Sequence, residues 1–142
     1  MIIATLSASF REGTNNSSFC TDWPFLTNDE QRKIAQLVVD LGAGTSLVGK
    51  NKPSHVYDDF GKIKGSDGYE ECGYWHYHCG ITWIPHTYKC HTIALRFNPD
   101  GMASDECIHY YKEDEDKIVI VGYSKQHSPF MLSDVPGNPF FD

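Results

Sequence analysis

The chain has 142 residues, of which 40% are hydrophobic and 13% are aromatic. That length lies in the usual range for one folded unit, so we expect a single domain over residues 1–142 with its own hydrophobic core. A net charge of −7 argues against a general nucleic-acid binder, because phosphate contacts need lysine and arginine on the binding face. Any contact with RNA therefore needs a local basic patch.

The apolar runs are short, as in Lys117 to Val121, whereas a membrane-spanning helix needs roughly 20 apolar residues. The first residues, Met1 to Ala4, lack the basic region of a secretory signal. We therefore expect a soluble, cytoplasmic protein with no membrane partner. Five cysteines without a Cys-x-x-Cys pair predict free thiols in place of a disulfide framework or a zinc ribbon.

The first expected elements are a strand and a well-marked helix. Ile2 to Phe10 is the first strand candidate, and Arg11 to Thr21 is polar enough to be a loop. Thr27 and Glu30 have the spacing of a capping box, so a helix should run from about Asn28 to Leu41 and end at Gly42. Its buried face should carry the apolar residues that recur at helical spacing: Ile34, Leu37, Val38 and Leu41.

Strands dominate the second half of the prediction. Residues 73–84 are rich in aromatics, 92–97 are apolar up to Asn98, and 106–111 with 117–123 flank a charged turn at 112–116. The last pair predicts a β-hairpin. The sequence thus indicates an α+β fold, with one helix packed on a mainly antiparallel sheet.

The strand Trp75-His76-Tyr77-His78 is the main candidate for chemistry. A strand has a period of two, so Trp75 and Tyr77 can enter the core while His76 and His78 share the opposite surface. Imidazole titrates near neutrality, so the pair can provide a base and an acid, or two metal ligands. His127, which follows the last strand, is either a further catalytic side chain or a surface histidine.

Other interpretations of this region stay open. A zinc site would need further ligands, and the neighbouring candidates, in no recognisable zinc spacing, are Cys79, His86, Cys90 and His91. Ser104-Asp105 indicates a turn or a polar contact to a ligand. The candidate basic patch consists of Lys50, Lys52, Lys62 and Lys64, which equally fit a mixed solvated surface.

Several short motifs, taken in order, resemble the YafO family of bacterial type II toxins. They span about positions 30 to 128 and comprise Val48-Gly49-Lys50-Asn51-Lys52, Tyr57-Asp58-Asp59, Trp75-His76-Tyr77-His78, Ser104-Asp105 with Tyr110, and the strand that ends at His127. The family is grouped with RelE-like toxins. The resemblance implies a RelE/ParE-like domain with a helix against a curved, mainly antiparallel sheet, ribosome-dependent cleavage of mRNA, no metal or other cofactor, and a cognate antitoxin protein as partner.

Carried over by position, the resemblance also implies roles for individual residues. His76 and His78 match the family's His-x-His strand, and His127 matches its late histidine. Either strand histidine would be the base and His127 the acid in an attack by the ribose 2′-hydroxyl on the adjacent phosphate. Cations would offset the phosphorane charge, and the candidates are Lys50, Lys52, Arg96 and Lys125. Polar support would come from Ser104, Asp105 and Tyr110.

A second hypothesis follows from the acidic balance. A non-catalytic immunity or inhibitor protein could use its negative charge to capture a basic partner. The histidine face favours the endonuclease, and the net charge of −7 favours the acidic binding protein. Expression in a bacterial host separates them, because a toxin should arrest growth unless its antitoxin is supplied.

Overall fold

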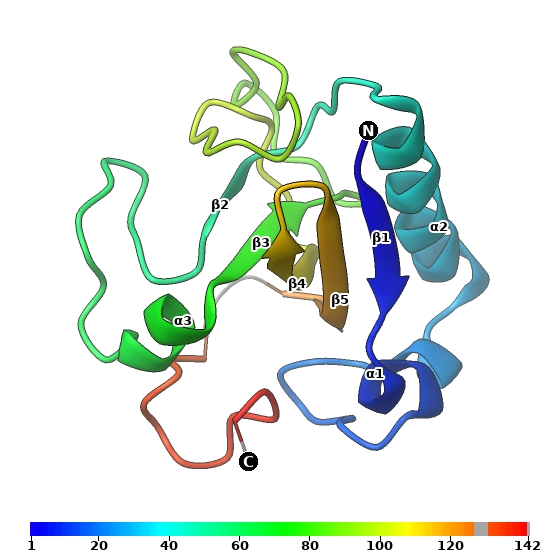
Figure 1. The fold of residues 1–142 in the computed structure, drawn as a ribbon. Helices are drawn as coiled ribbons and strands as arrows, with labels where there is room; N and C mark the ends of the chain where they lie inside the picture. Colours follow the sequence, from blue (N-terminus) through cyan, green and yellow to red (C-terminus); the bar gives the residue numbers. More distant parts are fainter. Residues whose placement is uncertain (127–130, 142) are drawn as a thin grey trace.

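Within residues 1–126 and 131–141, which the computed structural model describes, five strands form one mixed sheet in the order β1-β5-β4-β3-β2 (Figure 1). β1 runs parallel to β5, and the other neighbours are antiparallel. The elements in chain order are β1 (Ile3–Leu6), α1 (Ala8–Glu12), the 3₁₀-helix η1 (Trp23–Phe25), α2 (Asn28–Ala43), β2 (Asn51–Pro53), α3 (Asp67–Cys72), β3 (Tyr74–His78), β4 (Cys107–Asp114) and β5 (Lys117–Ser124).

The predicted helix is α2, and its capping box is present. The Thr27 amide donates to Glu30 Oε1 over 2.8 Å, and the Glu30 amide donates to Thr27 Oγ1 over 3.2 Å. These bonds satisfy amides that have no partner inside the helix. The helix passes the predicted end at Gly42 and stops two residues later, because Gly44 adopts the left-handed conformation (φ 72°) that closes it.

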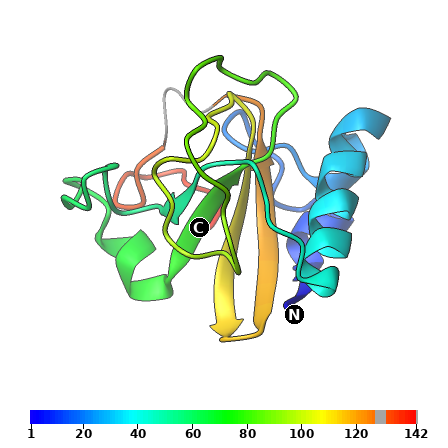
Figure 2. The same ribbon diagram turned by 90° about the horizontal axis from the view of Figure 1, so that it is seen from above.

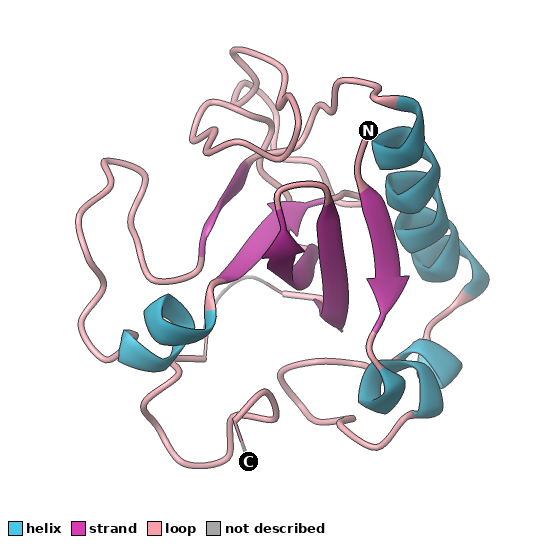
Figure 3. Cartoon of the chain, in the orientation of Figure 1, coloured by secondary structure: helices cyan, strands magenta, loops and turns pink. Residues whose placement is uncertain are grey.

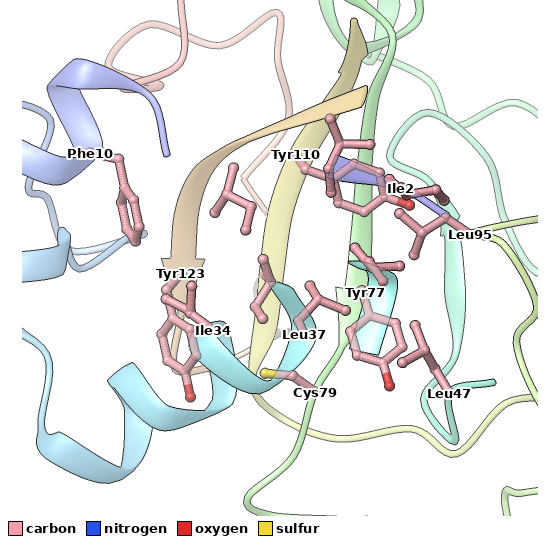
Figure 4. Packing of buried hydrophobic residues seen from close by; sticks show 14 of the residues in the cluster. Ile2, Phe10, Ile34, Leu37, Leu47, Tyr77, Cys79, Leu95, Tyr110 and Tyr123 are labelled. Carbon is pink, nitrogen blue, oxygen red and sulfur yellow. The ribbon is translucent and has the colours of Figure 1, made fainter. Parts of the chain in front are cut away.

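One face of the sheet packs against α2 and forms the hydrophobic core (Figure 4). Ile34, Leu37 and Leu41 of the helix are buried in the same cluster as Tyr77 of β3, and Trp75 packs against that cluster. The prediction that the helix covers the face that carries Trp75 and Tyr77 is therefore confirmed. So is the α+β class, with a helix on a mostly antiparallel sheet.

The first predicted strand is too long. β1 ends at Leu6, and Ser7 caps α1 by accepting a hydrogen bond from the Phe10 amide over 3.3 Å. Phe10 is therefore helical and fully buried, which explains why the apolar residues of this segment do not alternate.

Two further predicted segments differ from the structure in the long connection from β3 to β4, which Figure 3 draws as a pink loop. The strand predicted at 73–84 ends at His78. The strand predicted at 92–97 is wrong, since Ala94 and Leu95 have positive φ angles (53° and 52°) that no strand allows. Leu95 is nevertheless fully buried, and its carbonyl accepts from Lys112 Nζ over 2.9 Å. Tertiary contacts therefore set the conformation of this segment.

The C-terminal residues 131–141 lie against α3, on the side of the molecule away from α2 (Figures 1 and 2). Tyr69 donates from its hydroxyl to the Met131 carbonyl, and Asn138 Nδ2 donates to that hydroxyl over 2.9 Å. Asp134 accepts from the Gly68 amide over 3.1 Å. No helix among the described residues is long and apolar enough to cross a bilayer.

Replacing Leu37 by alanine tests the packing of α2. Leu37 is only 3% exposed in the main cluster, so Leu37→Ala should lower the free energy of unfolding by about 2–5 kcal/mol. Val39→Ala, on the same helix at a side chain that is 62% exposed, is the control and should change it by much less. Equal effects of the two substitutions on urea denaturation would contradict the packing.

Candidate active site

The sheet face opposite α2 carries lysines and histidines on neighbouring strands. Asn51 of β2 points toward the core, where its Oδ1 accepts from the Tyr110 hydroxyl over 2.7 Å. Lys50 and Lys52 flank Asn51 and therefore point to the other face. Lys52 pairs in register with His76 of β3. Two ammonium groups and the histidines of β3 thus share one face, on strands held together by backbone hydrogen bonds.

The two predicted histidines lie side by side, and a third joins them. The rings of His76 and His78 are 5.4 Å apart between centroids. His109 of β4 pairs in register with His76, and these rings are 6.0 Å apart. Sequence reasoning missed His109. Alternation along its strand places it opposite Ile108 and Tyr110, which face the core, but only the pairing of β4 with β3 brings it beside His76. We call His76, His78 and His109 the histidine row.

The histidine row is buried, contrary to the expectation that the imidazoles lie on an open surface. His76, His78 and His109 are 2%, 2% and 1% exposed. The rings of Phe19 and Phe140 cover His109 at centroid distances of 5.3 and 5.4 Å.

The backbone makes room for this cover at one position. Gly122 is the register partner of His109 and has no side chain. A Cβ at this position would lie 2.8 Å from the Phe140 ring, which is too close. Segments distant in sequence therefore close over the row.

Each imidazole of the row has a defined polar neighbour. His76 Nδ1 lies 3.0 Å from Ser54 Oγ, and His109 Nε2 lies 2.9 Å from Ser124 Oγ. The nearest oxygen to His78 Nδ1 is the Ser104 carbonyl, at 2.9 Å. The Ser104 amide nitrogen also lies 3.3 Å from the same ring nitrogen. A carbonyl accepts and an amide donates, so these two contacts fit either neutral tautomer of His78.

The residues predicted as polar support act on the frame around the row. Ser104 accepts from the Gly80 amide over 3.0 Å and donates to the Glu106 carbonyl over 2.7 Å, which holds the loop beside His78. Tyr110 is fully buried and holds Asn51 in the core, whereas Asp105 is exposed.

Cys107 lies beside the row but is not set up as a nucleophile. Its Sγ is 3.6 Å from His78 Nδ1, a pairing that in an exposed site would suggest a cysteine–histidine dyad. Cys107 is fully buried, and this burial raises its pKa well above the ordinary value. The sulfur therefore stays a thiol, and a thiol is a poor nucleophile.

Lys50 and Lys52 converge on one carboxylate, that of Asp58. Lys50 Nζ lies 2.9 Å from Asp58 Oδ2, and Lys52 Nζ lies 3.0 Å from Asp58 Oδ1. The lysine side chains are 16% and 8% exposed, whereas that of Asp58 is 53% exposed. Partial burial opposes ionisation of Asp58, but the hydrogen bonds and charges of the two lysines outweigh it and lower its pKa. We call this group the lysine pair with Asp58.

The other predicted cations lie apart from this pair. Lys62 binds Asp67 and, over 2.9 Å, Glu70 of α3, so the predicted four-lysine patch is divided. Arg96 and Lys125 are exposed, and Lys125 Nζ lies 3.9 Å from Glu30. His127 lies outside the described residues.

The structure also bears on the zinc hypothesis, within residues 1–126 and 131–141. There, no group of three or more histidine, cysteine, aspartate or glutamate side chains is arranged to hold a metal ion.

The chain matches no protein-family model, no curated protein and no solved structure. The chemistry of this face therefore has to be argued from its own side chains.

The low pKa of Asp58 predicts a pH-dependent contribution to stability. A carboxylate whose pKa falls below its ordinary value of 3.8 on folding stabilises the fold above that pH. The contribution is lost as the pH falls through the lower, folded-state pKa. The difference in unfolding free energy between wild type and Asp58→Asn should therefore shrink as the pH falls from about 5 to about 3.

Urea denaturation at several pH values measures this difference. The control is Asp59→Asn, which removes one negative charge at the next residue. The Asp59 carboxylate accepts a hydrogen bond from the Gly61 amide. The same pH dependence in both variants would contradict the role of the lysine pair.

Proposed function

We propose that this chain is a toxin that cleaves mRNA on the ribosome, with a RelE/ParE-like domain over residues 1–142. The resemblance of its motifs to the YafO family suggests the activity, and the helix on a mostly antiparallel sheet is compatible with that domain. The observation that carries the proposal is the histidine row beside the lysine pair on one sheet face. Its partners would be the ribosome, mRNA and a cognate antitoxin.

The reaction needs a base, an acid and positive charge, and requires no metal ion. His78 or His76 takes the proton from a ribose 2′-hydroxyl, and the resulting oxygen forms a bond to the adjacent phosphorus. The bond from phosphorus to the 5′-oxygen breaks, and an acid, His127 in this assignment, protonates the leaving oxygen. Lys50 and Lys52 offset the charge on the phosphorane. The products are a 2′,3′-cyclic phosphate and a 5′-hydroxyl.

Burial of the histidine row adds a conformational step to this proposal. All three imidazoles are buried, so RNA can reach the row only if the segments around it move, among them Phe19 and Phe140 beside His109. These side chains come from a loop and from the C-terminal segment, outside the strands that hold the row. We therefore assign catalysis to an open state that binding to the ribosome favours over the closed one.

The second candidate, an acidic protein that binds a basic partner, has its own support. Beside the net charge of −7, the end of β4 and the turn that follows it expose consecutive acidic residues at 113–116. The buried histidine row would then be a structural polar network, and expression of the chain would not arrest growth.

Histidine substitutions test the endonuclease. His78→Ala and His127→Ala should each lower the rate of mRNA cleavage on translating ribosomes by roughly 10²–10⁴-fold, because each removes one proton-transfer group. Growth arrest should weaken in parallel, and a metal chelator should leave cleavage unchanged. The control is His91→Ala, at an exposed histidine outside the row.

Each variant must unfold like the parent for this comparison. Full toxicity of both folded variants would refute the acid–base assignment. A wild-type chain that neither arrests growth nor cleaves mRNA would favour the acidic binding protein.

A further inference from the structure

A short hairpin carries Asp58 to the two lysines. The Ile63 amide donates to the His55 carbonyl over 2.8 Å, and the Tyr57 amide donates to the Gly61 carbonyl over 2.8 Å. We call residues 55–63 the Asp58 hairpin. The lysines belong to β2 and the residue before it, so the cations stand on the sheet while their counter-ion stands on a loop.

The tip of the hairpin is strained. Phe60 has a φ of 70°, a left-handed conformation that is unfavourable for a bulky residue. Phe60 is 60% exposed, and its ring meets that of Phe97 edge-on at a centroid distance of 4.9 Å. Strain at the tip favours release of the hairpin, and such strain is common in segments that switch.

The lysine pair has the chemistry of a phosphate site. Two ammonium groups hold the two oxygens of one carboxylate at 2.9 and 3.0 Å, and a phosphodiester can present two oxygens to the same donors. Lys52 is nearly buried, so it needs an anion beside it in either state. Exchange of a carboxylate for a phosphate keeps that charge compensated.

A ligand can reach Lys50 and the Asp58 carboxylate without unfolding the sheet. A cavity of about 520 Å³ lies beside Lys50 and Asp58. Its wall also includes Lys89, His86 and Thr87, which can donate hydrogen bonds to an anion. The carboxylates of Asp59 and Asp100 line it as well. The cavity therefore joins the occupied anion site to solvent.

We propose that Lys50 and Lys52 form a binding site for a backbone phosphate of RNA, and that Asp58 occupies this site as an internal competitor which the phosphate displaces. The identity of the ligand as RNA rests on the proposed function. Because Asp58 belongs to the same chain, its effective concentration at the lysines is high, and free phosphate should bind the wild-type protein weakly. The Asp58 hairpin is thus an autoinhibitory contact that substrate relieves.

Titration of the full chain with inorganic phosphate tests the site directly. Asp58→Asn removes the competing charge and should raise the affinity for phosphate by roughly three- to tenfold, the range expected for loss of a partly exposed ion pair. Asp59 also lines the cavity, but its carboxylate accepts from the Gly61 amide. Asp59→Asn therefore makes the same change of net charge without releasing the lysines, and it should raise the affinity less than about twofold. Adding Lys50→Gln to Asp58→Asn should abolish the gain.

A single-stranded oligoribonucleotide is the second probe and separates an RNA site from a general phosphate site. Its affinity should rise in Asp58→Asn by at least the factor found for phosphate, and the dependence of binding on salt should steepen. A gain for inorganic phosphate without one for the oligoribonucleotide would overturn the RNA assignment.

Loss of Asp58 leaves Lys52 without its anion, so a second variant guards against failure to fold. Lys52→Met combined with Asp58→Asn removes the nearly buried ammonium with its partner and leaves Lys50 facing the cavity. This variant should still bind phosphate more tightly than Asp59→Asn does. Equal affinity of the Asp58 and Asp59 variants, or a gain that survives Lys50→Gln, would overturn the inference.

The outcomes also separate this inference from the proposed function. If Asp58→Asn binds phosphate more tightly but the wild-type chain does not cleave mRNA, the proposed endonuclease function is wrong and the anion site stands. If the wild-type chain cleaves mRNA but Asp58→Asn binds phosphate no more tightly, the endonuclease function stands and the role proposed for Asp58 is wrong.

Discussion

The two-residue period of the central strands gives this protein two different sheet faces. On β3 and β4 it sends Tyr77, Ile108 and Tyr110 toward α2, and it sends the histidine row to the opposite face. A shift of one residue in the pairing of β3 with β4 would bury the imidazoles against the helix and expose the aromatics. The core and the candidate site therefore depend on the same register.

The second face is polar and yet covered, which is an unusual use of a sheet. Buried polar groups are tolerated when they have hydrogen-bond partners, and Ser54, Ser104 and Ser124 supply such contacts to the histidine row. The lysine pair is satisfied in the same way by Asp58. In both places a residue from a loop or a neighbouring strand supplies the polar contact.

That arrangement explains how an acidic chain could act on RNA. Net charge sets long-range attraction, whereas a phosphate responds most strongly to the ammonium groups within a few ångströms of it. In the proposed mechanism, Asp58 on the lysines hides the positive charge until a phosphate competes for it. The acidic surface would then limit binding to RNA that the ribosome presents, which is consistent with the proposed dependence on the ribosome.

The sequence predicted the elements that depend on residues close together in the chain. The capping box at Thr27 and the helical spacing from Ile34 to Leu41 sufficed for α2, and alternation sufficed to place His76 and His78 on one face. His109 needed the pairing of two strands, which local patterns do not fix.

The remaining differences arise from contacts between distant parts of the chain. The conformation of Leu95 depends on Lys112, and the cover over the histidine row depends on Phe19 and Phe140. No local pattern records that such segments meet. The pairing of Lys50 and Lys52 with Asp58 was hidden for a related reason. The turn that follows β2, where the Val56 amide donates to the Pro53 carbonyl, brings the carboxylate back to the lysines.

Analysis of the RNA ends left by the purified chain on translating ribosomes tests the central claim most directly. Attack by the ribose 2′-hydroxyl leaves a 2′,3′-cyclic phosphate on the upstream fragment and a 5′-hydroxyl on the downstream one, so the account predicts these ends, formed only when ribosomes are present. Fragments that carry a 5′-phosphate, or intact mRNA after prolonged incubation with active ribosomes, would contradict it.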